Sequence, residues 1–510
     1  MDGERLERHP RRVGEGLIAV QSRRSSLTLT LLLGVPLLAD GWLSAALLGG
    51  ALDYVVSAVV ALGALIFIHE LGHFAVAKAM GVGVERFSLG FGPRIFSFRR
   101  GETEYCVSIV PLGGYVKMTG EEAHGEDAIH PTTEAPPIDP AKSFSTKPLW
   151  ARFLIVLAGP GMNFVLAAVI FAIVFAAVGL PVLDPTVGRT LPDSAAAQAG
   201  LRPRDRIAAI DGRPVEHWGE IEEVVLRAEG RPLVFTILRD GARRDVTLTP
   251  RKVPARTPYN EPTEAWSIGA RPYLPPVVGE VRAGMPAAEA GLQPRDRVVA
   301  LNGQPIETWD ELAETISTKA GETLTLGIER GGSRMDVTVT PKIEVDRDPL
   351  GNETRVGRIG IATATSQTFK RLDPVSAVVR GVARTWDVTV ITVVSIWKLV
   401  TGTIPASNIG GPLQISMVAG QQAQQGVVSY AFFVALISVN LAILNLLPVP
   451  MLDGGHLLFF AIEAILGRPL SLRKREIAQQ IGLALLLLLM VFALFNDLTR
   501  LLPPVGKMFR

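Results

Sequence analysis

The sequence predicts a multi-pass α-helical membrane protein that carries two α+β modules between its second and third core helices. Three observations lead to this fold class. Hydrophobic residues make up 48% of the 510-residue chain, and the mean hydropathy is positive. Four apolar runs are each long enough, at about 20 residues, to cross a bilayer as a helix. The long segment between the second and third runs holds an internal repeat in which apolar and polar residues alternate as in strands.

Basic residues between the apolar runs set an orientation. Lys and Arg gather between the first two runs, and again between the last two in GRPLSLRKRE. Because cytoplasmic loops are enriched in Lys and Arg, both segments should face the cytoplasm. The long middle segment should then lie in the periplasm, and the protein in the inner (cell) membrane of a bacterium. The four runs are approximately Tyr54 to Met80, Phe153 to Leu180, Val427 to Leu447 and Ile477 to Phe495.

The N-terminal extension, residues 1–50, leaves three interpretations open. A basic stretch precedes a weaker apolar run, Leu27 to Gly50, that Pro36 and Asp40 interrupt. This layout fits an extra helix that starts in the cytoplasm, and it also fits a signal peptide. A misassigned start codon is the third interpretation, since LDYVVSAVV from Leu52 would make a natural beginning. Whether these residues belong to the mature protein therefore stays open.

Charge and cysteine content exclude several classes of function. The formal net charge of +2 creates no overall field that would attract nucleic acid, so no nucleic-acid partner is expected. Cys106 is the only cysteine, which excludes an internal disulfide and a cysteine-rich metal cluster. The partner that the composition does imply is the lipid bilayer.

The internal repeat predicts two homologous modules. SAAAQAGLRPRDRIAAIDGRPVEHWGEI, from Ser194, aligns with MPAAEAGLQPRDRVVALNGQPIETWDEL, from Met285, at a constant offset. An alternating run with a Gly-containing turn follows each copy, as expected of a half-buried hairpin. The pattern resembles a bacterial PDZ domain, which implies that peptide or protein termini bind there; two structural spacers are the alternative. We expect the first module over 181–255 and the second over 256–348.

The remaining segments are assigned from their local patterns. Between the first two core helices, two alternating runs should pair as a hairpin that turns at Arg100-Gly101-Glu102. From Asp373 to about Val400, charged residues share a segment with an apolar face, which fits an interfacial helix better than a fifth span. The expected segments are 51–80 (first core helix), 81–148 (cytoplasmic-side hairpin and linker), 149–180 (second core helix), 349–425 (amphipathic region), 426–456 (third core helix), 457–476 (cytoplasmic loop) and 477–500 (fourth core helix).

The motif IFIHELGHF, residues 66–74, places ionisable side chains inside the first apolar run. Such groups are costly at bilayer depth and are usually functional there. H-E-x-x-H on a helix puts His69 and His73 one turn apart on one face, so both imidazoles can bind one zinc ion. Glu70 lies about 100° round the helix from His69. It is therefore placed to take a proton from water instead of binding the metal.

The third metal ligand must come from another segment, because a hydrolytic zinc site uses three protein ligands and one open position. NLLPVPMLDGG carries Asp453, and Pro448 and Pro450 interrupt helical hydrogen bonding before it. A carboxylate on broken helix is tolerated at membrane depth where it lines a polar cavity. The predicted orientation puts this carboxylate and HELGH towards the same, cytoplasmic side. His456 is a competing ligand candidate.

HELGH in a first core helix and NLLPVPMLDGG in a later one resemble the paired motifs of the site-2 proteases, which are membrane-embedded zinc metalloproteases. Two PDZ-like modules between the second and third core helices make the chain similar to the regulator-of-sigma-E branch, over about residues 52–500. The resemblance implies that one zinc ion binds to His69, His73 and Asp453 and that Glu70 is catalytic. It also implies that Asn440 and Asn445 lie near a bound substrate helix.

The same resemblance implies a role for further segments and a substrate class. The hairpin matches a membrane-dipping β-hairpin that would pair with substrate as an added strand, and AGPGMNF, with Asn163, matches a second-helix motif of unassigned role. The expected substrate is the transmembrane segment of a single-span protein, after a first periplasmic cut, as in an anti-sigma factor. Two alternatives stay open: an inactive PDZ scaffold with structural zinc, and a protease that clears signal-peptide remnants.

Overall fold

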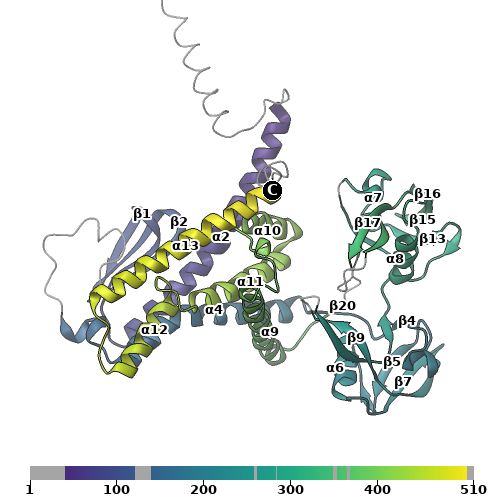
Figure 1. Cartoon of the computed structure of the whole chain (residues 1–510), viewed down its shortest axis with the longest axis horizontal. Helices are drawn as coiled ribbons and strands as arrows, with labels where there is room; N and C mark the ends of the chain where they lie inside the picture. The colour runs from purple at the N-terminus through teal and green to yellow at the C-terminus, as the bar shows by residue number, and fades with distance from the viewer. Residues whose placement is uncertain are drawn as a thin grey trace, which may run out of the picture. The chain divides into compact units, whose positions relative to one another are not determined.

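The structure, a computed structural model, describes residues 41–120, 139–257, 261–282, 284–347, 353–364 and 368–501. Residues 1–40, most of the expected N-terminal extension, lie outside the described residues. The chain divides into two units, one formed by Met1–Asn163 with Ser407–Arg510 and the other by Phe164–Ala406. Figure 1 shows the helices and strands of both units.

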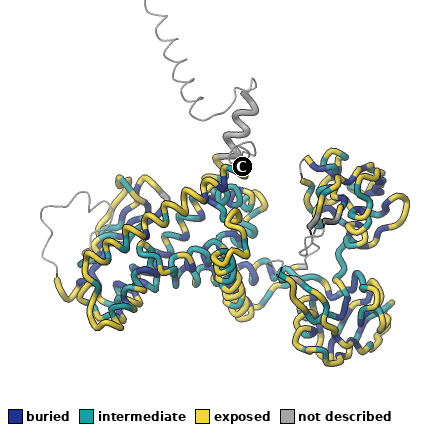
Figure 2. Tube along the Cα trace, in the orientation of Figure 1, coloured by how far each residue is buried: buried dark blue, intermediate teal, exposed yellow. Residues whose placement is uncertain are grey.

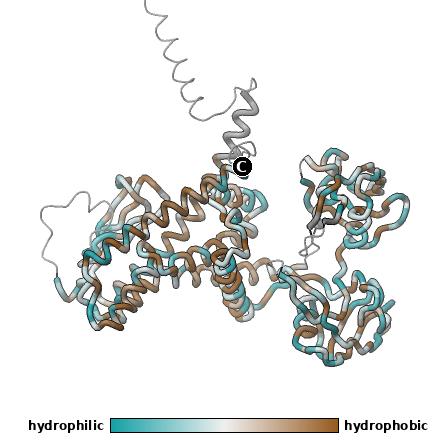
Figure 3. Tube along the Cα trace, in the orientation of Figure 1, coloured by the Kyte–Doolittle hydropathy of each residue, from teal (hydrophilic) through white to brown (hydrophobic). Residues whose placement is uncertain are grey.

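Four helices of the described chain are long and apolar enough to cross a membrane, as predicted. Their apolar stretches are Leu52–Ala79 in α2 (Gly41–Ala79), Leu149–Ala177 in α4 (Leu149–Ala177), Val427–Asn445 in α11 (Val427–Asn445) and Leu472–Arg500 in α13 (Leu472–Leu501). Figure 3 shows that α13 is mainly hydrophobic, and Figure 2 shows that much of it is exposed. Exposed apolar side chains along a whole helix are expected where lipid is the solvent.

Small residues let the membrane helices approach closely. A Cβ added at Gly72 of α2 would lie 2.3 Å from the carbonyl oxygen of Ala158 in α4. Near the middle of α2, Ala58 and Ala61 pack with Ala419 and Phe433, which lie in α10 (Pro412–Gln425) and α11. Such small-residue contacts are the usual basis of helix packing in membranes. They fix α2, which carries the HELGH motif, against its neighbours.

The third core helix does not run through to residue 456, as the sequence analysis expected. α11 ends at Asn445, and Asp453 begins a separate helix, α12 (Asp453–Leu466). The break follows from Pro448 and Pro450, which lack the N–H that a continuing helix needs. Residues 457–466, expected in a cytoplasmic loop, are helical because the apolar face of HLLFFAIEAIL supports α12.

Two long strands pair with each other between the first two core helices. β1 (Val84–Arg100) and β2 (Thr103–Met118) pair antiparallel, and Gly101 supplies the positive φ of +66° that the turn requires. The turn residue Glu102 accepts hydrogen bonds from Lys78 at the end of α2 (2.7 Å) and from Lys142 (2.8 Å). Lys142 belongs to η1 (Pro140–Lys142), which η2 (Phe144–Thr146) follows before α4. These ion pairs connect the hairpin turn to the helix that carries the histidines.

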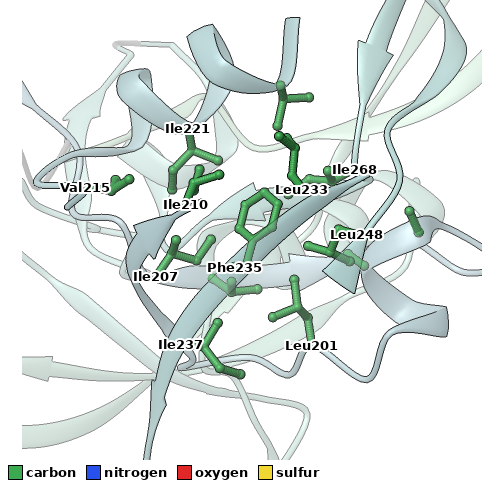
Figure 4. Close-up of a cluster of buried hydrophobic side chains, with 14 of the residues drawn as sticks. Leu201, Ile207, Ile210, Val215, Ile221, Leu233, Phe235, Ile237, Leu248 and Ile268 are labelled. Carbon is green, nitrogen blue, oxygen red and sulfur yellow. The ribbon is translucent and has the colours of Figure 1, made fainter. Parts of the chain in front are cut away.

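The other unit contains the two modules that the repeat predicts. In each, a four-stranded antiparallel sheet packs with a ten-residue helix around a buried apolar core (Figure 4 shows the first core). The first module has β4 (Val187–Thr190), α5 (Ala195–Gln198), β5 (Arg206–Ile210), β6 (Arg213–Pro214), α6 (Trp218–Arg227), β7 (Leu233–Arg239), β8 (Ala242–Leu248) and β11 (Ala270–Pro272). The second has β12 (Val278–Val281), α7 (Pro286–Glu289), β13 (Arg297–Leu301), β14 (Gln304–Pro305), α8 (Trp309–Thr318), β15 (Leu324–Arg330), β16 (Ser333–Val339) and β19 (Ile361–Thr363).

Each module extends further along the chain than the alternation indicated. Ile268 belongs to the first core and Ile359 to the second, beyond the expected ends at residues 255 and 348. The cause is long-range pairing, because β11 returns to β4 and β19 returns to β12. In each module, one further hairpin precedes the returning strand. It is formed by β9 (Arg251–Arg256) with β10 (Pro262–Ser267) in the first module and by β17 (Lys342–Arg347) with β18 (Glu353–Arg358) in the second.

A buried ion pair recurs at the equivalent place in both modules. Asp205 is 1% exposed and accepts two hydrogen bonds from the Arg239 guanidinium (2.7 and 2.6 Å) and one from the Arg202 N–H (2.7 Å). Burial by itself would raise the pKa of Asp205, but these hydrogen bonds outweigh it and hold the pKa below its usual range. In the second module, Asp296 and Arg330 repeat the arrangement.

The modules are followed by an amphipathic helix, α9 (Pro374–Val400), which is not among the candidate membrane spans. Its buried residues recur every three to four positions, and Gly381 lies against α4 near Ala168. The opposite face exposes large apolar side chains, among them Trp386 and Trp397. Before α9, β20 (Thr368–Lys370) pairs with β3 (Leu180–Val182), the strand that follows α4. The chain therefore leaves and rejoins the helices through a paired two-stranded segment.

Candidate metal centre

Three side chains from two distant parts of the sequence converge inside the membrane unit. His69 and His73 lie one turn apart on α2 and are 6% and 8% exposed. Their Nε2 atoms are 3.1 Å apart, and Oδ2 of Asp453 lies 3.0 Å from Nε2 of His69 and 3.5 Å from Nε2 of His73. Among the described residues, this is the group of His, Cys, Asp and Glu side chains whose atoms could hold a metal ion.

The separations between these atoms fit a tetrahedral zinc ion. Ligand atoms about 2.0–2.1 Å from such an ion lie about 3.3–3.4 Å apart. The three observed separations, 3.0, 3.1 and 3.5 Å, lie close to that value. Oδ2 of Asp453 is also buried without a hydrogen-bond partner, so it is available as a ligand atom. Two imidazoles and a carboxylate are ligands that zinc commonly takes in hydrolytic sites.

Helix α4 supplies the wall beside the two histidines. A Cβ added at Gly159 would lie 2.2 Å from Nε2 of His73 and 2.8 Å from Nε2 of His69. The side-chain amide of Asn163, one turn further on, lies 3.3 Å from Nδ1 of His69, and the carbonyl of Ile155 accepts a hydrogen bond from Nδ1 of His73 (2.9 Å). The AGPGMNF segment thus lies against the metal-site histidines, a position that its sequence did not reveal.

The turn before α12 places Asp453. A Cβ at Gly454 would lie 2.2 Å from the carbonyl oxygen of Leu447, and one at Gly455 would lie 2.4 Å from that of Val449. The first turn of α12 therefore packs directly on the backbone of the LLPVP segment, which is possible only without side chains at these two positions. The LDGG sequence is explained by this close approach, because it turns the carboxylate back towards α2.

A nearly buried ion pair fixes α12 against α4. Arg152 donates two hydrogen bonds to the carboxylate of Glu463, and the two side chains are 12% and 15% exposed. The guanidinium also lies over the ring of Phe460, 5.1 Å from its centre. Bidentate pairs of this kind fix orientation as well as distance. The pair was not anticipated from the sequence, since its members lie more than three hundred positions apart.

Glu70 lies beside the group but does not belong to it. It is next to His69 on α2 and faces β2, where Gly114 approaches its side chain. A Cβ at Gly114 would lie 3.3 Å from Cγ of Glu70, so the glycine leaves room for the side chain. The arrangement leaves the carboxylate near the two histidines and outside the group of candidate ligands.

The other predicted site residues lie on the two helices around Asp453. The Asn445 amide lies 3.5 Å from Nδ1 of His69, so this residue meets the predicted site. Asn440 is half-buried and lies five positions earlier on α11. His456, the competing ligand candidate, packs edge-on against Phe459 and is not in the candidate metal group of the described residues.

Helices of membrane length around a His-His-Asp group that could hold a metal ion are the architecture expected of a membrane-embedded metalloprotein. Comparison with known proteins gives the family. The model of Peptidase family M50 matches residues 57–489. The chain therefore belongs to peptidase family M50, and it is a zinc metalloprotease and a multi-pass protein of the inner membrane.

Several proteins are similar to this chain over nearly their whole length. "Regulator of sigma-E protease RseP" of Salmonella typhimurium is 38% identical over 451 residues, which cover 87% of this chain and 98% of that protein. The Escherichia coli protein of the same name is 38% identical over 461 residues, with the same coverage. A Neisseria meningitidis protein, named provisionally as a zinc metalloprotease, is 39% identical over 448 residues, 86% of this chain and 97% of that protein.

Two solved structures are similar to a part of this chain. The PDZ domain of an SdrC-like protein from Listeria monocytogenes is 22% identical, with a TM-score of 0.14, and covers 17% of this chain and 85% of that chain. The corresponding domain from Listeria innocua is 21% identical, with a TM-score of 0.15, and covers 19% and 99%.

Proposed function

We propose that this intramembrane zinc metalloprotease cleaves a peptide bond within the transmembrane segment of a single-span membrane protein. The observation that carries the proposal is the convergence of His69, His73 and Asp453 on one point within helices of membrane length, with Glu70 beside it. Groups of this kind are costly inside a bilayer unless they act there. A substrate that is itself a membrane helix accounts for their location.

The residues of the site have different roles in hydrolysis. His69, His73 and Asp453 would hold one zinc ion, which supplies a Lewis acid for the scissile carbonyl when it is bound. Glu70 takes a proton from the attacking water and returns it to the departing amine. Its position one residue after His69 places it beside the metal ligands on the β2 side, without making it a ligand.

The hairpin would hold the substrate in an extended form. A membrane helix satisfies its own backbone hydrogen bonds, so it must unwind locally before a peptide bond can be attacked. β1 and β2 form a two-stranded sheet, so each has a free edge within the described chain. Phe96, Phe98 and Ile109 of this sheet are 52–60% exposed, as expected of a hairpin that dips into the membrane. An unwound substrate segment would add to this sheet as a strand, with Asn440 and Asn445 near it.

The two modules are proposed to be PDZ domains on the periplasmic side. Their shared topology and the basic segments on the opposite side of the spans support this placement. There they would bind peptide or protein termini, and α9 would lie in the membrane interface through its exposed tryptophan face. As the resemblance to the regulator-of-sigma-E branch implies, the substrate would be of the anti-sigma-factor type, already cut once in the periplasm.

A cleavage assay in detergent tests the proposal. A tagged single-span substrate with a truncated periplasmic side is incubated with wild type and with Glu70→Gln, and the zinc content of both is measured. We expect wild type to cut within the span and a chelator to stop it. Glu70→Gln should keep its zinc and lose at least about 100-fold of the cleavage rate, the scale of a lost general base.

Glu476→Gln is the matched control, because Glu476 is an exposed glutamate near the start of α13, outside the candidate ligands and the hairpin. It should cut at the wild-type rate. If wild type and Glu70→Gln both hold zinc and neither cuts several such substrates, the site is structural and the chain is a scaffold. If Glu70→Gln cuts as fast as wild type, the assigned general base is wrong.

A further inference from the structure

A neutral histidine carries its proton on one ring nitrogen and can bind a metal only through the other. The hydrogen bond made by the nitrogen that faces away from the metal therefore decides whether the second nitrogen can bind it. For His73 this is settled by Ile155, whose carbonyl oxygen lies 2.9 Å from Nδ1. A carbonyl only accepts, so Nδ1 carries the proton and Nε2 presents its lone pair to the site. At Nδ1 of His69, the side-chain amides of Asn163 (3.3 Å) and Asn445 (3.5 Å) lie in the corresponding place.

Asn163 is held more firmly at this position than Asn445. Its side chain is completely buried, whereas Asn445 is half-buried and lies at the limit of hydrogen-bond distance. The hydroxyl of Ser438 in α11 donates to the backbone carbonyl of Asn163 (2.7 Å), which connects this part of α4 to the neighbouring helix. Oδ1 of Asn163 is one of three buried side-chain atoms in the described chain that have no hydrogen-bond partner.

The two orientations of the Asn163 amide have opposite consequences for His69. With the amino group towards Nδ1, as placed here, Nδ1 accepts, so the proton of the neutral ring sits on Nε2 and that nitrogen cannot bind a cation. With Oδ1 towards Nδ1, the ring donates and the lone pair of Nε2 faces the metal. The carbonyl and amino ends of the amide have nearly the same shape, so a half-turn exchanges them in the same space.

We propose that Asn163 is the positioning residue for His69: its Oδ1 accepts the Nδ1 proton and so holds Nε2 ready for the metal. The role rests on the proposed metal site. It assigns a function to Asn163 in the AGPGMNF segment of α4; Ile155, three residues before that segment, serves the other histidine. Water is scarce at this depth, so an aliphatic side chain at 163 would leave the His69 N–H without a partner, at a cost that burial increases.

The test measures the zinc affinity of the full chain in detergent by competition with a chromophoric chelator. Asn163→Leu keeps the volume and removes the acceptor, and should weaken zinc binding about 10- to 100-fold. Asn163→Asp keeps an acceptor at the same place and should stay within a few-fold of wild type. Asn496→Leu is the matched control: Asn496 is also a buried asparagine on a membrane helix, but it donates to the carbonyl of Ile409 (3.3 Å). Its zinc affinity should be that of wild type.

Three results would overturn the assignment: an Asn163→Leu affinity equal to wild type, an Asn163→Asp affinity as weak as that of Asn163→Leu, or an equal loss in Asn496→Leu. The unfolding temperature of each variant, measured without zinc, separates weak binding from misfolding. If Asn163→Leu and Asn163→Asp both unfold near the wild-type temperature, a loss of affinity in Asn163→Leu alone reports the missing acceptor. Failure of the proposed metal site would look different, since wild type itself would not bind zinc in the same titration.

Discussion

Replacing Gly159 by alanine should abolish metal binding with the smallest possible change in the chain. The added Cβ would lie 2.2 Å from Nε2 of His73 and 2.8 Å from Nε2 of His69, whereas ordinary contact begins at 3.4 Å. The His73 ring would have to retreat by about 1.2 Å to restore contact distance, although metal-site geometry tolerates only about 0.2 Å in ligand distances. That retreat would also break its 2.9 Å hydrogen bond to Ile155. We expect zinc affinity to fall by more than about 100-fold, beyond the usual loss of a supporting partner.

The same helix offers the control. A Cβ at Gly161, two positions further along α4, would have nothing within 4 Å. Alanine is a better helix former than glycine by about 0.5–1 kcal/mol, so Gly161→Ala should be neutral or slightly stabilising and should bind zinc like wild type. Chelator competition gives the affinities, and the unfolding temperatures in detergent, measured without zinc, show whether α4 still packs. An unchanged zinc affinity in Gly159→Ala would refute the position assigned to α4 beside the histidines.

Two further predictions concern ion pairs. Arg152→Leu should lower the unfolding temperature strongly, because an unpaired buried Glu463 costs about 3–5 kcal/mol. The double variant, Arg152→Leu with Glu463→Leu, should recover most of that loss. A double variant as unstable as Arg152→Leu alone would contradict the prediction. Asp205, whose pKa is held low in the folded first module, stabilises that module above the unfolded-state pKa near 4, and this stability is lost as the pH falls through the lower, folded-state pKa. The protection of the β7 amides, which is the exchange rate measured relative to the intrinsic rate at the same pH, should therefore fall towards low pH in wild type. Asp205→Asn should be less protected at neutral pH and should depend less on acid; equal pH profiles of protection would contradict the prediction.

The sequence is most informative where the signal is local or where two motifs are individually unusual. Apolar runs of sufficient length identify the four spans directly, because length and hydropathy decide whether a helix can cross a bilayer. HELGH and LDGG are informative because ionisable residues are rare at membrane depth unless they have a function there. The constant offset of the repeat likewise predicts two modules of one topology.

Prediction stopped where the determining contacts are long-range. The return of β11 to β4 lengthens the first module, and neither strand differs in pattern from an ordinary surface strand. The Arg152–Glu463 pair and the approach of Asn163 to His69 depend on how α4 lies against α12 and α2. Such long-range contacts cannot be predicted from the composition of the segments. In AGPGMNF, Gly159 and Asn163 could equally have been helix-packing residues. Only their distances to the histidine rings indicate that they belong to the surroundings of the candidate metal site.

The glycine beside the histidines also bears on whether a zinc ion here would be catalytic or structural. Structural zinc sites are closed by four protein ligands, whereas catalytic sites use three and keep one position open. The described residues bring together three candidate ligands, and the side of α4 that faces the two ring nitrogens carries only the bare Cα of Gly159. Three protein ligands would leave one position of a bound zinc ion open, and Glu70 lies next to His69 to move a proton. A scaffold with structural zinc would need neither the open position nor the glutamate, so the arrangement favours hydrolysis.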